Sequence, residues 1–264
     1  MLNKTRILFR FLTYRLKAKS KHAIHSPFVY DFICNVLEDK TVYPEYKTVE
    51  QQVIRLKRNP NSIETVDFGA RRGRTGYTTK LRRVKEIAAT TGIPRKYGRL
   101  LFRTVKYFNP ETMLELGTSA GISTMYQAIA APSAGFKTIE GCASTAALAQ
   151  ESLNSAGCSN VSLVMGNFDK VLPETLGSLN RVDYAFIDGN HTYEATVNYF
   201  GEIASKSGND TLLIFHDIHW SAEMEKAWEE IIKHPRVTVT IDLFDMGLVF
   251  FRRELSRQHF VIRY

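Results

Sequence analysis

The chain has 264 residues, and 44% of them are hydrophobic, so it can bury a sizeable core and is not a disordered protein. No run approaches the roughly 20 apolar residues that cross a bilayer, and no signal-peptide pattern follows the basic N-terminus. The three cysteines form no CxxC pair, which argues against structural zinc and disulfides and favours a cytoplasmic protein.

The net charge of +8 is divided unevenly along the chain. Residues 1–110 contain 24 Lys and Arg against 8 Asp and Glu, whereas residues 111–264 contain 11 against 19. This asymmetry predicts two parts: a basic, mainly helical region over residues 1–93 and a larger domain over residues 94–264. The basic charges either meet an anionic partner such as a nucleic acid or simply interact with solvent.

The first 20 residues have the pattern of an amphipathic helix. Leu8, Leu12 and Leu16 share a face at helical spacing, and arginines and lysines surround them. The helix either lies on an anionic membrane surface or packs on the protein or on a second copy in a homodimer, and the pattern favours the latter two. A second helix is expected from Ser26 and Pro27, its cap and first residue, to about Leu37.

Two further signals lie before residue 110. Residues 68–76 hold three glycines and three arginines, so this segment is either an anion-binding loop or a solvated linker. Pro94 is expected to open a helix that runs to about Phe108, where Asn109 and Pro110 end it.

Beyond residue 110, strands alternate with helices. Apolar strands are predicted over residues 113–116, 136–139, 161–165, 182–187 and 211–215, and helices over residues 122–131, 193–204 and 222–232. Another helix would be capped by Ser144 and end at Gly157. The last two strands, over residues 237–241 and 248–251, have no helix between them. This order is typical of a mostly parallel α/β sheet with one antiparallel edge strand.

The first of these strands ends in the sequence Glu115-Leu-Gly-Thr-Ser-Ala-Gly121. Gly117 and Gly121 let the backbone turn sharply and approach a ligand, and the next helix presents free N–H groups. Thr118 stands where a dinucleotide fingerprint has its middle glycine, and there is no P-loop Gly-Lys-Ser/Thr. The turn therefore argues against dinucleotides and nucleoside triphosphates.

The next two strand ends carry polar and aromatic residues. The second strand ends at Glu140, 23 residues beyond Gly117, where a carboxylate can accept two hydrogen bonds from a ribose diol. Gly166, Asn167 and Phe168 follow the third strand and provide an amide and an aromatic ring suited to adenine. Because ligands bind at the carboxyl ends of parallel strands, these elements predict an adenosine-containing ligand.

This arrangement resembles the class I S-adenosylmethionine-dependent methyltransferases over about residues 94–253. The resemblance implies S-adenosylmethionine as cofactor and a seven-stranded Rossmann-like sheet whose last strand is antiparallel. Glu115 would orient the loop or the amino end of the cofactor, and Ser119 and the glycines would flank its methionine part. The implied cofactor-binding residues are Glu115, Gly117, Thr118, Ser119, Gly121, Glu140, Gly166, Asn167, Phe168 and Asp188.

Acidic residues and histidines follow the fourth and fifth strands, in the segments 188–193 and 216–220. Both strand ends are expected to face the crevice that holds the cofactor. A histidine is suited to act as a general base near neutral pH. We therefore predict Asp188, His191 and His216 as catalytic residues, with His191 as the base, and expect His219 at the surface.

The Asp-Gly-x-His-x-Tyr and His-Asp segments resemble metal-assisted small-molecule O-methyltransferases such as catechol O-methyltransferase. This resemblance implies Asp188 and Asp217 as ligands of a divalent cation such as Mg²⁺, with His216 as a third ligand. Mg²⁺ prefers oxygen ligands, however, so metal binding is left open.

The segment after the fourth strand lacks the Asn/Asp-Pro-Pro-Tyr/Phe pattern of nucleic-acid amine methyltransferases. Its Asp-Gly-Asn-His sequence supplies acid–base groups instead, which favours a hydroxyl acceptor. We predict an O-methyltransferase for a small or lipid-like acceptor. An RNA methyltransferase that uses the basic region, and a binding module without catalytic activity, are the alternatives.

Overall fold

The computed structural model describes residues 2–67 and 78–264. The Gly/Arg-rich loop predicted over residues 68–76 lies outside the described residues. By its internal contacts the chain divides into a first unit, Met1–Glu38 with Asn180–Tyr264, and a second unit, Asp39–Leu179. This division differs from the predicted boundary between residues 93 and 94, because the N-terminal helices pack with the C-terminal part of the chain.

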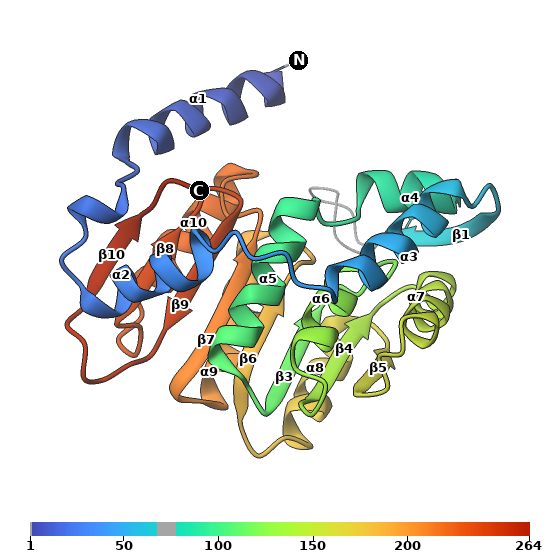
Figure 1. Cartoon of the computed structure of the whole chain (residues 1–264). Helices are drawn as coiled ribbons and strands as arrows, with labels where there is room; N and C mark the ends of the chain where they lie inside the picture. The colour runs from blue at the N-terminus through green and yellow to red at the C-terminus, as the bar shows by residue number, and fades with distance from the viewer. Residues whose placement is uncertain (1, 68–77) are drawn as a thin grey trace. The chain divides into compact units, whose positions relative to one another are not determined.

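The first unit contributes five strands to the main sheet, in the order β10-β8-β9-β7-β6 (Figure 1). They are β6 (Val182–Ile187), β7 (Ser207–His216), β8 (Val239–Asp242), β9 (Met246–Phe250) and β10 (Gln258–Val261). Strands β6 and β7 are parallel, whereas β9 is antiparallel to both of its neighbours, β7 and β8. Strand β10 is parallel to β8.

The helices of the first unit come from both ends of the chain. They are α1 (Leu2–Lys17), α2 (Pro27–Phe32), α9 (Tyr193–Ser205) and α10 (Ala222–Lys233), with the short helices η1 (Lys21–Ala23) and η2 (Ile33–Leu37). The predicted cap of α2 is confirmed, because the Ser26 hydroxyl accepts a hydrogen bond from the backbone N–H of Val29 at 3.4 Å. The helix then continues as the π-helical turn η2, which ends at Leu37 as expected.

Helices α2 and α10 pack on opposite faces of strand β9. Phe28 of α2 meets Phe250 edge to face, with ring centroids 5.0 Å apart. On the other side, a Cβ added to Gly247 would lie 2.6 Å from the ring of Trp228 in α10. Residues 247 and 250 are three apart, so their side chains point to opposite faces of the sheet. Gly247 thus makes room for the Trp228 ring directly against the strand.

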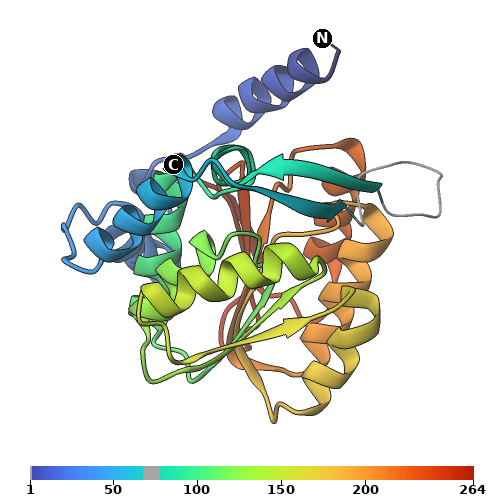
Figure 2. The same ribbon diagram turned by 90° about the vertical axis from the view of Figure 1, so that its right-hand side faces the viewer.

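The second unit contributes the parallel strands β3-β4-β5. Its strands are β1 (Ser62–Asp67), β2 (Thr78–Arg83), β3 (Thr112–Leu116), β4 (Gly135–Glu140) and β5 (Val161–Met165). Its helices are α3 (Tyr46–Arg58), α4 (Val84–Thr90), α5 (Arg95–Phe108), α6 (Ile122–Ala130), α7 (Ala143–Ser155) and α8 (Phe168–Gly177). Strands β1 and β2 form a separate antiparallel pair beside α7 (Figure 2).

The predicted fold class, an α/β fold with a mostly parallel sheet, is confirmed, with two corrections. The main sheet has eight strands and not seven, because Gln258–Val261 adds a parallel strand beside β8. The antiparallel strand β9 pairs with both β7 and β8, so it is not an edge strand. Ser144 is also not the cap of α7, because Cys142 occupies the cap position and the helix begins at Ala143.

Gly98 provides a test of the packing between α5 and α6. A Cβ at this position would overlap the buried ring of Tyr126. Gly98→Ala is therefore expected to destabilise the protein by roughly 1–3 kcal/mol through overpacking. Chemical denaturation measures this change.

Gly201→Ala is the matched control, because Gly201 also lies within a helix but has no neighbouring atom within 4 Å of the added Cβ. Its effect should be a stabilisation of at most about 1 kcal/mol, since alanine is the better helix former. Equal effects of the two substitutions would contradict the packing described here.

Candidate functional site

The turn between β3 and α6 has three residues with left-handed backbone conformations. Gly117, Ser119 and Gly121 have φ angles of 98°, 48° and 81°. Glycine adopts this region without strain, whereas Ser119 is a rare non-glycine residue in it. The turn places Gly121 at the N-cap of α6, so the first N–H groups of this helix end next to the loop.

The carboxylate of Glu115, in the strand before this turn, binds the elements on either side of the turn through hydrogen bonds. Glu115 is fully buried in β3, and its two oxygens accept hydrogen bonds from four side chains. The donors are Ser123, Thr124 and Gln127 of α6 and Thr138 of β4. Of the two roles implied for Glu115, the contacts fit the orientation of the loop, because both oxygens are already engaged by protein donors.

Burial raises the pKa of Glu115 to about 7, and the four hydrogen bonds act in the opposite direction. The desolvation of the charge therefore outweighs its stabilisation by neutral donors. Near neutral pH, this carboxyl is poised between its two protonation states.

The two loop residues after Gly117 point in different directions. The hydroxyl of Thr118 is buried and lies 2.6 Å from the Thr138 hydroxyl, so its side chain belongs to the core below the turn. The backbone N–H of Ser119 donates to Glu140 at 2.8 Å, and its hydroxyl lies 3.0 Å from that of Thr91. The side chain of Thr118 is therefore not exposed to a ligand of the turn.

Glu140 ends strand β4 directly beside the turn. Its Oε2 accepts the hydrogen bond from Ser119, and its Oε1 accepts one from the backbone N–H of Cys142 at 2.9 Å. Burial raises the pKa of Glu140, against the effect of these backbone donors. Each carboxylate oxygen can accept a second hydrogen bond, so both hydroxyls of a ribose diol can still be recognised.

The third predicted element follows β5 at the same sheet edge. Gly166 donates its backbone N–H to the carbonyl of Glu140 at 2.9 Å. Asn167 is the N-cap of α8, where its side-chain oxygen accepts a hydrogen bond from the backbone N–H of Asp169 at 2.9 Å. Phe168 is the first residue of that helix. The sequence did not predict this helix.

The three elements predicted to bind the cofactor therefore come together within the second unit. Strands β3, β4 and β5 are consecutive and parallel, so their carboxyl ends share one edge. Hydrogen bonds join the glycine turn to Glu140 and Glu140 to Gly166. The glycine turn and Glu140, which the sequence interpretation requires to be neighbours, lie next to each other.

The predicted acid–base residues gather at the ends of β6 and β7 in the first unit. The Nδ1 of His216 lies 3.0 Å from Oδ1 of Asp188 and 3.7 Å from Oδ2 of Asp217. The Nε2 of His191 lies 3.7 Å from Oδ1 of Asp188 and 3.9 Å from Oδ2 of Asp217. His191 keeps twice the exposure of His216, 30% against 15%.

The charges within this cluster are strongly coupled. Burial lowers the pKa of His216, but the negative charge of Asp188 and the hydrogen bond to it outweigh burial and raise the pKa to about 9. Burial likewise opposes ionisation of Asp188, whose pKa is nevertheless held below its usual value by His216. Near neutral pH, His216 is therefore a cation paired with Asp188.

The donor set does not fit the implied Mg²⁺ site. Nδ1 of His216 lies 3.0 Å from Oδ1 of Asp188, so this oxygen already has a protein partner. The described part of the chain has no group of three or more His, Cys, Asp or Glu side chains placed to hold a metal ion. Two imidazoles among two carboxylates are also a poor match for a cation that demands oxygen ligands.

His219 is not the surface residue that the sequence predicted. Its Nε2 lies 2.8 Å from Asp242 and its Nδ1 lies 3.2 Å from Glu225, and its ring stacks on Phe244 with centroids 5.2 Å apart. Burial lowers the pKa of His219, but its two acidic partners raise it overall. This histidine links β8 to α10 within the first unit.

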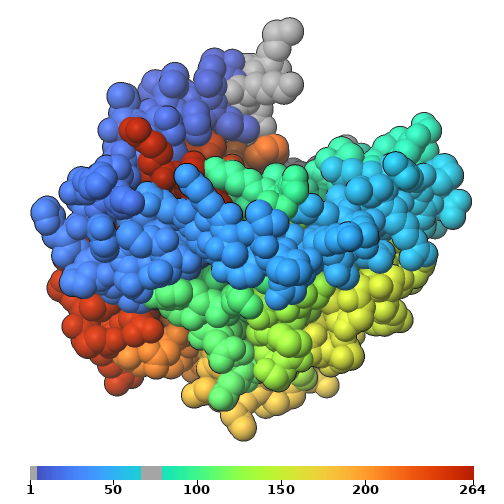
Figure 3. Space-filling view, viewed as in Figure 1, coloured from blue at the N-terminus to red at the C-terminus, as the bar shows by residue number. Residues whose placement is uncertain are grey.

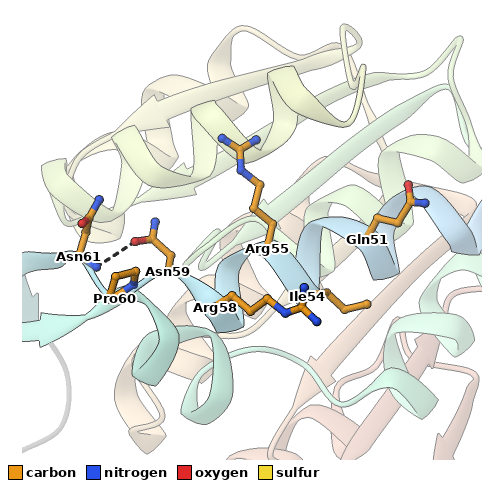
Figure 4. A pocket seen from close by; sticks show the side chains of 7 residues that line it. All are labelled: Gln51, Ile54, Arg55, Arg58, Asn59, Pro60 and Asn61. Carbon is orange, nitrogen blue, oxygen red and sulfur yellow. Dashed lines mark hydrogen bonds between the residues drawn. The ribbon is translucent and has the colours of Figure 1, made fainter.

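A surface depression lies elsewhere on the second unit (Figure 4). It has a volume of about 590 Å³ and is lined by Gln51, Ile54, Arg55, Arg58, Asn59, Pro60 and Asn61. Arg55 is turned towards α7, where it pairs with Glu151 at 2.8 Å. None of the predicted site residues lines this depression, so it is not the cofactor site.

Sequence reasoning missed the four side chains that hold Glu115. A detectable signal existed, because Ser123, Thr124 and Gln127 are polar residues in the otherwise apolar sequence of α6. Polar groups in a buried helix require partners, and the acidic residue of the preceding strand is the nearest candidate. Thr138 carried no such signal, because threonine is common in strands.

The pKa of Glu115 generates a prediction about stability. The carboxyl has a pKa of about 7 in the folded protein and an ordinary value in the unfolded chain, so its contribution is fully present at low pH and is lost as pH rises. Between about pH 4.5 and pH 7.5, the wild type should lose roughly 3 kcal/mol of stability relative to Glu115→Gln. Urea denaturation at a series of pH values measures both proteins.

Glu115→Gln is the matched variant because its amide retains the shape of the side chain, and the hydroxyls of Thr124 and Thr138 can accept as well as donate. If the stabilities of the two proteins follow parallel curves across this pH range, Glu115 does not ionise as described.

Comparison with known proteins identifies the type of domain. A family model described as a methyltransferase domain matches residues 114–218, which include the glycine turn, Glu140 and the cluster around Asp188. No curated protein shows a significant sequence match.

Solved structures of methyltransferases share the fold at low sequence identity. An O-methyltransferase from Bacillus cereus in complex with SAH is 18% identical, with a TM-score of 0.56 over 84% of this chain and 97% of that chain. The O-methyltransferase TomG from Streptomyces achromogenes, in complex with SAM, is 18% identical, with a TM-score of 0.54 over 85% and 95%. The SAH-bound methyltransferase PaMTH1 from Podospora anserina is 13% identical, with a TM-score of 0.59 over 87% and 97%.

These matches agree with the predicted S-adenosylmethionine-dependent enzyme. Residues 114–218 match a methyltransferase-domain model, and the chain shares its fold with solved O-methyltransferases that have SAH or SAM bound.

Proposed function

We propose that this protein transfers the methyl group of S-adenosylmethionine to a hydroxyl oxygen of a small or lipid-like acceptor. The observation that carries the proposal is the hydrogen bond between the glycine turn and Glu140, which unites the two predicted ends of an adenosyl site. The B. cereus and S. achromogenes proteins of similar fold are O-methyltransferases with SAH or SAM bound.

Each cofactor contact has a physical basis in the second unit. Glu140 would accept hydrogen bonds from the ribose hydroxyls, and Phe168 would pack against the adenine ring. The turn from Gly117 to Gly121, with the N–H groups that begin α6, would surround the methionine part. Bound S-adenosylmethionine supplies a methyl group that its sulfonium has already activated.

The acid–base cluster of the first unit would receive the proton of the acceptor. The acceptor hydroxyl has to lose its proton when its oxygen is methylated. His191 takes this proton at Nε2, and Asp188 and Asp217, at 3.7 and 3.9 Å, stabilise the resulting imidazolium. His216 holds Asp188 in its ionised form, so it positions the cluster and does not accept the proton.

The groups in this cluster favour a hydroxyl acceptor. A hydroxyl needs a base to release its proton as it is methylated, and His191 is half-exposed and therefore accessible to such a group. RNA as acceptor rests only on the basic charge of residues 1–110, and part of that charge is already neutralised. Arg95 and Arg99 both pair with Glu50, for example.

Binding of the product tests the cofactor site without an acceptor. In isothermal titration, S-adenosylhomocysteine should bind the wild type, and Glu140→Ala should weaken binding by about 10- to 100-fold through the loss of charged hydrogen bonds to ribose. Glu151→Ala, at an exposed acidic residue of α7, is the control and should bind like the wild type. Absence of heat with the wild type would remove the cofactor assignment.

Substitutions in the acid–base cluster test the second half of the proposal. Methyl transfer from radiolabelled S-adenosylmethionine to a panel of small hydroxyl compounds and extract fractions should fall by about 10²- to 10⁴-fold in His191→Gln and Asp188→Asn. Both variants should retain S-adenosylhomocysteine binding, and His25→Gln, at an exposed histidine, should retain full activity. Cofactor binding without transfer by the wild type to any fraction would instead identify a binding module.

A further inference from the structure

Helix α1 is attached to the first unit along one side only. The buried hydroxyl of Tyr14 donates to the carbonyl of Ile262 at 2.6 Å and accepts from the backbone N–H of Tyr264 at 3.2 Å. Arg10 pairs with Glu225 of α10 at 2.7 Å, and the ring of Phe11 meets that of Phe244 at 5.1 Å. Figure 3 shows this helix in dark blue with the red C-terminal segment against it.

The opposite side of α1 is an exposed apolar stripe. Leu8, Leu12 and Leu16 recur every fourth residue and are 57%, 52% and 89% exposed. Phe9 lies beside them and is 72% exposed. A protein surface rarely exposes four large apolar side chains in one row, so this outer stripe is a binding surface.

Cations border the outer stripe on both sides. With 3.6 residues per turn, Arg15 lies along one edge of the stripe, and Arg6 and Lys17 lie along the other. All three are exposed, and the sequence of α1 contains no acidic residue. Because Arg10 and Tyr14 fix the inner side, the stripe and its cations keep a constant orientation relative to the first unit.

We propose that the outer stripe of α1 binds the surface of an anionic lipid bilayer. The apolar row would enter the boundary between head groups and acyl chains, and the bordering cations would lie at the level of the phosphates. Within the described residues, no helix combines the length and hydropathy required to cross a bilayer. The helix would therefore lie parallel to the membrane plane.

Charge decides between a membrane and a second copy of this chain. In a two-fold contact through α1, each outer stripe meets the same stripe of its partner, so cations face cations and no acidic residue of the helix compensates them. An anionic bilayer instead complements every charge that borders the stripe. The inner side of α1 packs on the protein, as the sequence favoured, and the outer stripe is the part of the helix that this packing leaves exposed.

Vesicle sedimentation with the full-length protein tests the proposal independently of methyl transfer. The wild type should bind vesicles of phosphatidylcholine with about 30% phosphatidylserine at least about tenfold more tightly than vesicles of phosphatidylcholine alone. Leu12→Gln with Leu16→Gln should weaken binding by at least about tenfold. The control pair, Val42→Gln with Leu81→Gln, removes equally exposed apolar side chains (78% and 76%) outside α1 and should bind like the wild type.

A second pair of variants tests the contribution of the cations beside the outer stripe to lipid binding. Arg15→Gln with Lys17→Gln should lose the preference for phosphatidylserine, whereas Lys57→Gln with Arg58→Gln, in the last turn of α3, should keep it. All these side chains are exposed, and unchanged circular dichroism melting confirms that the variants fold. Equal binding to both vesicle types overturns the proposal, as does wild-type binding by the α1 variants. A solution dimer that Leu16→Gln dissociates, in a protein that does not bind vesicles, also overturns it.

Discussion

The buried carboxylate of Glu115 is the constraint on which the cofactor half of this protein depends. An acid without solvent must be surrounded by donors, and here these donors come from the start of α6 and from β4. The carboxylate therefore joins the end of β3 to the two elements beside it. The turn above it is hydrogen-bonded to Glu140, so the proposed adenosyl site lies directly beside the hydrogen bonds that stabilise this part of the core.

A second, partly buried acid has a comparable effect in the first unit. Asp188 keeps its charge because His216 carries the opposite charge next to it. The two residues are neighbours for a topological reason: Ile187 and Phe215 are paired in the register of the parallel strands β6 and β7, and Asp188 and His216 follow them directly. His191 is the more exposed histidine beside this ion pair, and for this reason we propose it as the base.

Much of the fold could be predicted because apolar residues recur at regular spacing in the strands of the main sheet and in the helices that connect them. Strands β5 and β6 begin and end at the predicted residues. The missed elements lacked such a period: β10 is short and begins with Gln258, and α8 contains Pro173, which normally argues against a helix. His219 was misplaced because its partners, Asp242 and Glu225, become neighbours only after the strands and helices have packed.

The sequence by itself determined the fold class, the order of the polar strand ends and the residue types at each of them, since these follow from local periodicity and from the rule that ligands lie at carboxyl strand ends. Only the tertiary structure decided which of these residues remain available to a ligand. Thr118 is committed to Thr138, His216 is committed to Asp188, and α1 has one bound and one exposed side. Burial and hydrogen-bond partners depend on contacts between residues far apart in the chain, and a linear pattern does not contain these contacts.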